Sequence, residues 1–205
     1  MKSDISHEFR NGMPFLGGSL WIDFVNTRFV LNGESVDFLR DEATLARWAN
    51  EAAIPLCEDL LAEELIEARI LRDSLGQAFA LLSAAKPLTE VIFETVNGFL
   101  YKMAIHLQLS RVNDCAALQD FEVVKGPKLA VRIATDFARF TANYEASRLK
   151  HCDNPACAMI FYDRGKNMRR RWCSTSICGN RDKVANYRAR QSQAGITAKH
   201  VTTPD

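Results

Sequence analysis

Four cysteines near the C-terminal end constrain this chain more than any other feature of its sequence. They form two pairs, Cys152 with Cys157 and Cys173 with Cys178, in a C-x4-C, x15, C-x4-C pattern. Two close thiolate pairs, brought together by an intervening hairpin, are the arrangement that holds structural zinc in a tetrahedral shell. Because four thiolates leave no open position for water or substrate, the pattern predicts a structural Zn2+ site. Reduced pairs without metal, or disulfides, are the alternatives.

Charge divides the chain at the same place. Residues 1–149 contain 15 Lys+Arg and 21 Asp+Glu, a net charge of −6, whereas residues 150–190 contain 10 Lys+Arg and 3 Asp, a net charge of +7. The overall net charge of +1 hides this asymmetry. Attraction to phosphates depends on local charge density, so we expect a polyanion to bind the basic segment.

Export and membrane insertion find no support in the sequence. The N-terminal residues lack the apolar core of a secretory signal, and no run of 18 apolar residues occurs. We therefore expect a cytoplasmic protein with no membrane partner. A reducing compartment favours metal thiolates over disulfides for the clustered cysteines. The isolated Cys57 and Cys115 are interpreted as small core residues.

Hydrophobic periodicity predicts an α+β fold with a helix-rich N-terminal domain over residues 1–148. Asp41 stands where a helix N-cap belongs, and the apolar stripe that follows it ends before Pro55. Asn32-Gly33 and Asn113-Asp114 are turn dipeptides between apolar runs. The predicted helices are 20–27, 41–54, 58–84, 90–103 and 128–148, and the predicted hairpins are 28–38 and 105–124.

The basic segment, residues 149–191, is predicted to fold as a small treble-clef zinc finger. Residues 159–162 and 169–172 are interpreted as two strands of one hairpin, and Ser174-Thr175-Ser176 as the cap of a helix that holds Cys178 in its first turn and runs to Arg190. So short a segment buries too little surface to fold alone, and zinc would contribute about 10 to 16 kcal/mol. The polar tail, 192–205, is expected to fray from about residue 191.

Exposed cations of this segment are the candidates for phosphate contacts. Alternation on the predicted strand separates Arg170, on the side of Trp172, from its two arginine neighbours. Arg181 follows a ligand by three residues and is expected to support the site by bonding a thiolate or a carbonyl group. A solvated face, or docking onto the acidic N-terminal domain, is the alternative for the whole set. The predicted nucleic-acid contacts are Lys166, Arg169, Arg171 and Lys183, supported by Arg188 and Arg190.

Arg72 is the most informative residue of the N-terminal domain, because it lies at the centre of an apolar helix face. A guanidinium buried there needs a carboxylate or an anionic ligand. In the structural interpretation, a carboxylate of the protein neutralises Arg72, and Asp23 and Glu64 are the candidates. In the alternative interpretation, Arg72 binds an anionic effector, Asn26 and Thr27 form hydrogen bonds with it, and Arg69 lies at the mouth of the pocket.

Longer motifs surround the cysteines: Ile160-Phe161-Tyr162-Asp163, Arg170-Arg171-Trp172-Cys173-Ser174 and Cys178-Gly179-Asn180-Arg181-x-Lys183. Together with Cys152-Asp153-x3-Cys157 they resemble the CGNR zinc-finger family, whose ligands correspond to all four cysteines. Upstream, Leu20-x-x-Asp23-Phe24-Val25-Asn26-Thr27, a Trp-bearing helix and Arg69-x-x-Arg72 are similar to the ABATE domain. That domain accompanies this finger in bacterial stress-induced transcription regulators, which implies DNA as the partner and an unknown small-molecule effector.

Taken together, these patterns predict a transcription regulator, and a homodimer is compatible with them. The four histidines are scattered, and no phosphate-cradling glycine loop or nucleophile elbow is present, so we do not expect an enzyme. An effector bound by the N-terminal domain would act through the helix 128–148, which is expected to run directly into Cys152. An RNA-associated zinc protein and a protein-interaction adaptor are the alternative functions.

Overall fold

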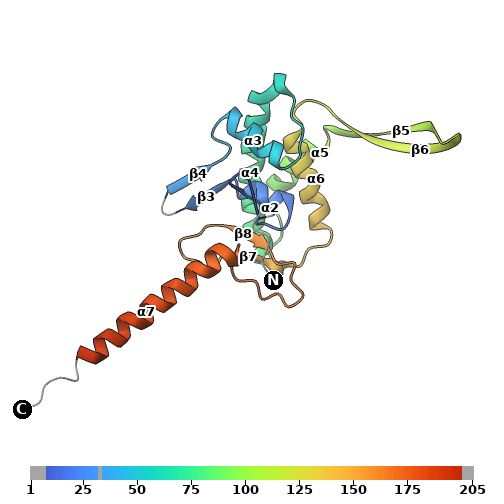
Figure 1. Ribbon diagram of the computed structural model, residues 1–205. Helices are drawn as coiled ribbons and strands as arrows, with labels where there is room; N and C mark the ends of the chain where they lie inside the picture. Colours follow the sequence, from blue (N-terminus) through green and yellow to red (C-terminus); the bar gives the residue numbers. More distant parts are fainter. Residues whose placement is uncertain (1–7, 32–33, 200–205) are drawn as a thin grey trace, which may run out of the picture.

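The computed structural model describes residues 8–31 and 34–199, which form a helical body from which the β5–β6 hairpin and helix α7 project on opposite sides (Figure 1). None of the helices in these two ranges is long and apolar enough to cross a membrane. The helices are α2 (Leu20–Val25), α3 (Glu42–Glu51), α4 (Leu61–Ser83), α5 (Glu90–Leu100), α6 (Leu129–Thr141) and α7 (Asn180–Lys199). The antiparallel hairpins are β1–β2 (Phe9–Arg10, Met13–Pro14), β3–β4 (Arg28–Leu31, Glu34–Asp37), β5–β6 (Met103–Val112, Cys115–Val124) and β7–β8 (Leu149–His151, Ile160–Tyr162).

The short helix α2 lies at the centre of the body, against α4 and α6. Trp21 is completely buried and makes edge contacts with the rings of Phe137 and Phe140, whose centroids lie 5.1 and 5.2 Å away. The carboxylate of Asp136, on α6, accepts hydrogen bonds from the Trp21 amide and the Ser19 hydroxyl. A side chain of a neighbouring helix therefore caps the first turn of α2, which its own sequence does not cap.

Helix α6 is capped in the same way by α4. Glu64, which has no exposed surface, accepts hydrogen bonds from the amides of Lys128 (2.7 Å) and Leu129 (2.9 Å). The carboxylate thus satisfies two of the amides that a helix leaves unpaired at its N-terminus. This use removes Glu64 from the candidates for an ion pair with Arg72.

Three features of the N-terminal region match the sequence prediction. The Asp41 side chain accepts a hydrogen bond from the Thr44 amide and caps α3. The predicted hairpin at 28–38 is β3–β4, although its turn dipeptide Asn32-Gly33 lies outside the described residues. The second predicted hairpin is β5–β6, where Asn113 and Asp114 adopt φ angles of 48° and 61°, which are the left-handed values of a two-residue type I′ turn.

The predicted helix 128–148 is wrong in its last turns, because α6 ends at Thr141 and is followed by the 3-10 turn Ala146–Arg148 (η2) and strand β7. Past the helix end, the Glu145 amide donates to the Tyr162 hydroxyl (3.2 Å). Residues 149–151 pair with β8 instead of continuing the helix. The expected rigid connection from α6 into Cys152 is therefore absent.

The predicted pairing of 159–162 with 169–172 is also wrong. Strand β8 pairs with β7, and 169–172 form an irregular loop. Lys150 explains this loop, because its ammonium group donates to the carbonyl of Arg170 (3.2 Å) and to the carboxylate of Asp163 (2.8 Å). Lys150 and Asp163 thus bond the carbonyl and the amide of Arg170, two backbone groups that a neighbouring strand would otherwise pair.

Two expectations about the ends of elements are corrected as well. Helix α7 continues to Lys199, so the backbone does not fray at residue 191. Cys115 is exposed at the tip of the β5–β6 hairpin, and Cys57 is only partly buried, so neither is a core residue. Periodicity could not reveal that the hairpin of Cys115 stands away from the body (Figure 1).

Candidate metal centre

The four cysteines come from two turns that the fold brings together. Cys152 and Cys157 flank the turn that joins β7 to β8, where the Asn154 side chain accepts a hydrogen bond from the Ala156 amide (3.0 Å). An asparagine that bonds the backbone two residues further on forms an Asx-turn. This local bond bends the chain so that both thiols of the first pair face the same side.

The second pair lies at the start of α7. Cys178 is held in a single π-helical turn, η3 (Thr175–Gly179), and not in the first α-helical turn. The Ser174 hydroxyl caps this turn by accepting a hydrogen bond from the Ile177 amide (3.3 Å), which confirms the predicted capping role. The order of knuckle, loop and ligand-bearing helix is compatible with a treble clef.

Distances between the sulfur atoms fit a tetrahedral metal. The Sγ atoms of all four cysteines lie within 4.8 Å of one another, and that of Cys173 lies 3.7 Å from Cys157 and 3.7 Å from Cys178. Sulfur atoms at about 2.3 Å from a central zinc are about 3.8 Å apart. Four thiols with these separations form the closed, all-sulfur ligand set that binds structural Zn2+.

The thiols interact strongly with one another. A hydrogen bond from Cys173 lowers the pKa of Cys157 to about 5, whereas burial and the neighbouring thiolates raise the pKa of Cys178 to about 12. The pKa of Cys173 is also raised, because its thiol donates to Cys157 and lies among three sulfur atoms. A divalent cation removes this conflict, since its charge stabilises all four thiolates together.

Arg170 binds the backbone of the second cysteine pair, a role that the sequence did not predict. Its guanidinium donates to the carbonyl groups of Cys173, Trp172 (3.0 Å) and Leu16 (2.9 Å), and it lies 4.4 Å from the centre of the Phe161 ring. The prediction that Arg170 is separated from Arg169 and Arg171 is confirmed, because of the three only Arg170 is partly buried. The separation follows from loop geometry and not from strand alternation.

Asp163 organises the loop between the two cysteine pairs. Its carboxylate accepts hydrogen bonds from the Gly165 amide (2.9 Å), the Arg170 amide (2.9 Å) and the Lys150 ammonium group. Burial alone would raise the pKa of Asp163, but these donors outweigh it and leave the pKa below its ordinary value. Asp163 ends the Ile160-Phe161-Tyr162-Asp163 motif, and these contacts give the physical reason for an acid at that position.

Residues of the N-terminal region form hydrogen bonds with the zinc finger along strand β8. The outer edge of β8, which β7 does not pair, is satisfied by Gly17, whose carbonyl accepts from the Tyr162 amide (2.7 Å), and by Asn26. The Asn26 side chain donates to the Ile160 carbonyl (2.8 Å) and accepts from the Ile160 amide (3.1 Å). A buried side-chain amide thus replaces the peptide group of a third strand.

A second hydrophobic cluster joins the same two regions. Leu16 and Phe29 pack with Phe161 and with Cys152, Cys173 and Cys178, separately from the main core. Gly18, at a φ of +77°, fits against β8 because a Cβ there would lie 2.9 Å from the Tyr162 carbonyl oxygen. The predicted boundary between 1–148 and 149–191 stays a prediction, and these contacts cross it.

The cations predicted to contact nucleic acid lie on the outside of the molecule. Lys166 and Arg169 are exposed in the loop, whereas Arg171 is exposed but paired with Asp153 at 2.7 Å. Lys183, Arg188 and Arg190 are exposed on α7. The fold therefore separates these residues into a loop group and a helix group.

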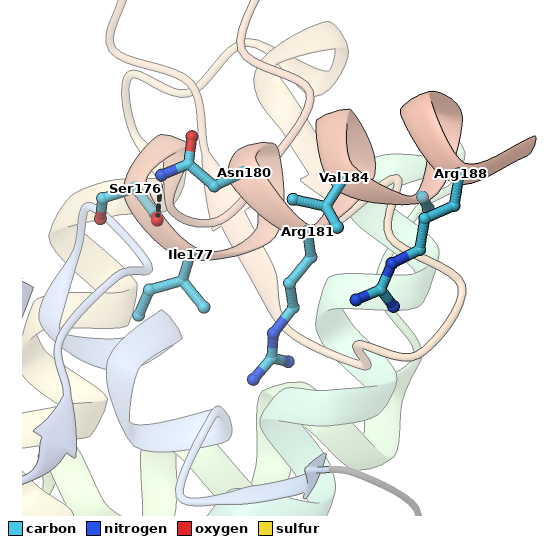
Figure 2. Close-up of a pocket in the computed structure, with 7 residues that line it drawn as sticks. Ser176, Ile177, Asn180, Arg181, Val184 and Arg188 are labelled. Carbon is cyan, nitrogen blue, oxygen red and sulfur yellow. Dashed lines mark hydrogen bonds between the residues drawn. The ribbon is translucent and has the colours of Figure 1, made fainter. Parts of the chain in front are cut away.

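Arg181 does not hold the metal site in the way that was expected. Its exposed side chain makes no hydrogen bond with a thiolate or a carbonyl group in the described part of the chain. Figure 2 shows Arg181 and Arg188 extending from the same side of α7, where they line a shallow depression with Ile177 and Val184. A backbone amide contacts a ligand sulfur instead of Arg181: the Cys173 amide donates to the Cys152 thiol at 3.4 Å.

Arg72 pairs with Asp37, not with Asp23 or Glu64. Only 3% of Arg72 is exposed, and its two terminal nitrogens contact the two Asp37 carboxylate oxygens at 2.6 and 2.9 Å. Burial raises the pKa of Asp37, but hydrogen bonds from Arg72 and the Leu39 amide outweigh it and lower the pKa overall. The sequence could not reveal this partner, because Asp37 lies on β4 and reaches α4 only through the tertiary fold.

The other predicted ligand-binding residues also bond within the protein. The Thr27 hydroxyl donates to the Phe24 carbonyl and accepts from Arg72 at 3.0 Å. Arg69 donates to the carbonyl groups of Leu39 (2.8 Å) and Arg40 (2.7 Å). The Nε atom of Arg72 has no hydrogen-bond partner among the described residues. The structure thus brings Thr27 and Arg72 together, and it directs Asn26 and Arg69 elsewhere.

Comparison with known proteins identifies two families in the predicted order. Residues 18–143 match the ABATE family, described as "Putative stress-induced transcription regulator", and residues 148–191 match the CGNR zinc finger, for which Zn2+ is the cofactor. A search of the curated proteins finds no significant match. Because the first match covers more than half of the chain, the protein belongs to the ABATE family and carries a CGNR zinc finger at its C-terminal end.

Proposed function

We propose that this transcription-regulator family member binds duplex DNA by placing helix α7 in the major groove. The observation that carries the proposal is the helix itself, which projects from the zinc finger and has no apolar face along its described residues (Figure 1). A helix that is polar all round gains little from packing on its own body. Its 20 residues span about 30 Å, and its diameter of about 10 to 12 Å matches a groove about 12 Å wide.

The distribution of cations on α7 supports this orientation. At 100° per residue, Arg181 and Arg188 share one flank of the helix, and Lys183 and Arg190 share the opposite flank. A helix in the major groove has a phosphate backbone on each side, so cations on both flanks match the two walls. The zinc site fixes the direction of the helix, because Cys178 lies in the turn that precedes it.

Between these two flanks, one edge of α7 carries no charged side chain among the residues from Asn180 to Gln191. It carries Val184, Tyr187 and Gln191, all of which are exposed. A glutamine amide can pair with adenine, and an apolar side chain can contact the methyl group of thymine. Asp182 and Asn186 lie on the opposite edge, bonded to each other at 3.1 Å, and would face away from the DNA.

The same geometry separates DNA from the alternative partners. The major groove of A-form RNA is deep and narrow and does not admit a helix, so duplex RNA should bind only through phosphates. An adaptor that docks on an acidic protein does not need cations on both flanks of one helix. We therefore favour a DNA-binding, non-enzymatic regulator over an RNA-associated protein or an adaptor.

Effector sensing is the second half of the proposed function, because a transcription regulator that responds to stress needs a signal to respond to. Asn26, Thr27, Arg69 and Arg72 already bond within the protein, so an effector bound there would have to replace these contacts. We expect such a regulator to act in the cytoplasm.

Binding to fluorescent duplexes, measured by anisotropy over a salt series, tests the proposal. Sequences for the duplex come from selection with a random DNA pool. Wild-type protein should prefer the selected duplex over duplex RNA, and the Lys183→Gln and Arg190→Gln variants should each weaken binding and reduce the salt slope by about 1. Lys86→Gln removes an exposed cation from the helical body and is the matched control. Equal affinity for DNA and RNA, or a salt slope that neither α7 variant changes, would contradict the proposal.

A further inference from the structure

The β5–β6 hairpin carries large apolar side chains into solvent. Ile105, Leu107, Leu109 and Leu118 are 60%, 67%, 73% and 69% exposed. The hairpin extends from the body with little support along most of its length (Figure 1). A two-stranded hairpin is at best marginally stable in water, so a chain that maintains one with exposed leucines is expected to cover them.

Strand register places these four side chains on one face. Leu109 is the direct partner of Leu118, and Ile105 and Leu107 precede Leu109 by four and two residues. Residues two apart on a strand share a face, and so do direct cross-strand partners. We call this surface, formed by Ile105, Leu107, Leu109 and Leu118, the ribbon face. The same face carries Asp120 and Glu122, the partners of Leu107 and Ile105, and the opposite face carries Gln108 and Gln119 together with the exposed Phe121 and Val112.

Charge argues against a nucleic acid or an anionic lipid surface as the partner of the ribbon face. Residues 103–124 contain one arginine, Arg111, and three acids, Asp114, Asp120 and Glu122, for a net charge of −2. Polyanions require an excess of cations at the contact. The partner is therefore a protein that presents an apolar surface.

We propose that the ribbon face is the contact between two copies of this chain, which form a homodimer through their hairpins. The four side chains expose roughly 500 Å2 per chain, so two copies would remove up to roughly 1,000 Å2 from water, which is the lower bound for a specific interface. In a two-fold dimer the same surface meets itself. The ribbon face is suited to this because Ile105, Leu107 and Leu109 form one apolar stripe along β5, with Asp120 and Glu122 beside it on β6.

The dimer leaves the proposed DNA contacts free. The hairpin and α7 project from opposite sides of the body, so the association of two hairpins does not cover either α7 (Figure 1). Dimerisation does not depend on DNA binding, and a protein that fails to bind DNA can still dimerise in this way.

Analytical ultracentrifugation of the full-length, zinc-loaded protein over a concentration series tests the dimer. Wild-type protein should reach twice the chain mass of 23.1 kDa. The Leu107→Lys, Leu109→Thr double variant should weaken dimerisation at least tenfold, because it places a charge and a hydroxyl group in the contact. Leu107 lies opposite Asp120, so the new lysine has an acidic partner within its own hairpin, and threonine in place of Leu109 is a residue that favours strands.

The matched control is Gln108→Lys, which adds the same charge one residue away on the opposite face and should dimerise like the wild type. Near-UV circular dichroism and zinc content check that each variant is folded. Hydrogen exchange is the second measurement, since amides of residues 103–124 should become more protected as the protein concentration rises. A wild-type protein that stays monomeric at about 100 μM, or a dimer that both variants retain equally, would overturn the proposal.

Discussion

Replacing Asn26 with alanine tests how the N-terminal region holds the zinc finger. Asn26 is 3% exposed, and its side-chain amide makes two hydrogen bonds to Ile160, one to the carbonyl and one to the amide. These two backbone groups face away from β7, so alanine would leave both without a protein partner. An unsatisfied buried polar group costs about 1 to 3 kcal/mol, which gives about 2 to 6 kcal/mol for the pair.

Thermal unfolding of the zinc-loaded protein, followed by circular dichroism, measures the effect. For a chain of this length each kcal/mol lowers Tm by about 2 to 4 °C, so we expect Asn26→Ala to lower Tm by about 4 °C at the low end of this range and by about 24 °C at its high end. Asn26→Asp keeps the size and one acceptor but places a carboxylate oxygen against the Ile160 carbonyl, so it should destabilise the protein at neutral pH as much as alanine does.

The control is Asn97→Ala, which removes an exposed amide from helix α5 and should change stability by less than about 0.5 kcal/mol. A loss below about 1 kcal/mol for Asn26→Ala would refute the reasoning, because it would mean that water replaces the side chain at the edge of β8. A stable Asn26→Asp variant would show that the cost arises from lost packing and not from the hydrogen bonds.

Two further predictions concern pH and metal. Burial raises the pKa of Asp23 to about 7 from 3.8, so the folded state holds a proton that the unfolded chain has released, and stability falls as pH rises from about 4 to about 7. Relative to Asp23→Asn, the wild type should lose about 2 kcal/mol between about pH 5 and about pH 7.5 in urea unfolding, and a pH-independent difference would disprove this. Chelation of zinc should abolish hydrogen-exchange protection in 149–190 but leave α4 and α6 protected, because the main core contains none of the four cysteines. Unchanged protection of the finger after zinc removal would argue against a structural metal.

Local signals explain why much of the fold follows from the sequence. The Asp41 cap, the Asn113-Asp114 turn and the long periodicity of α4 each depend on residues a few positions apart. The cysteine spacing belongs to the same class, because each pair is brought together by its own turn. The metal centre could therefore be predicted from the residues alone.

Where the prediction failed, residues distant in the chain compete for the same backbone groups. Strand β7 replaces the end of the predicted helix because β8 offers it partners, and Lys150 with Asp163 occupies the loop that was predicted to be a returning strand. Arg72 had two plausible acids within the sequence pattern, yet Asp37 reaches it from a hairpin. Propensity acts over a few residues and contains no information on such contacts.

Residue patterns alone identified the four zinc ligands, the positions of most helices and hairpins, and the charge difference between a basic finger and an acidic body. The packing of the whole chain was needed to show that Asn26 completes the edge of β8, that Arg170 lies beside the second cysteine pair, and that α7 and the β5–β6 hairpin project into solvent. Short-range patterns specify which helices and strands form. Burial and hydrogen bonding across the whole fold specify which side chains bond within the protein and which remain exposed to solvent.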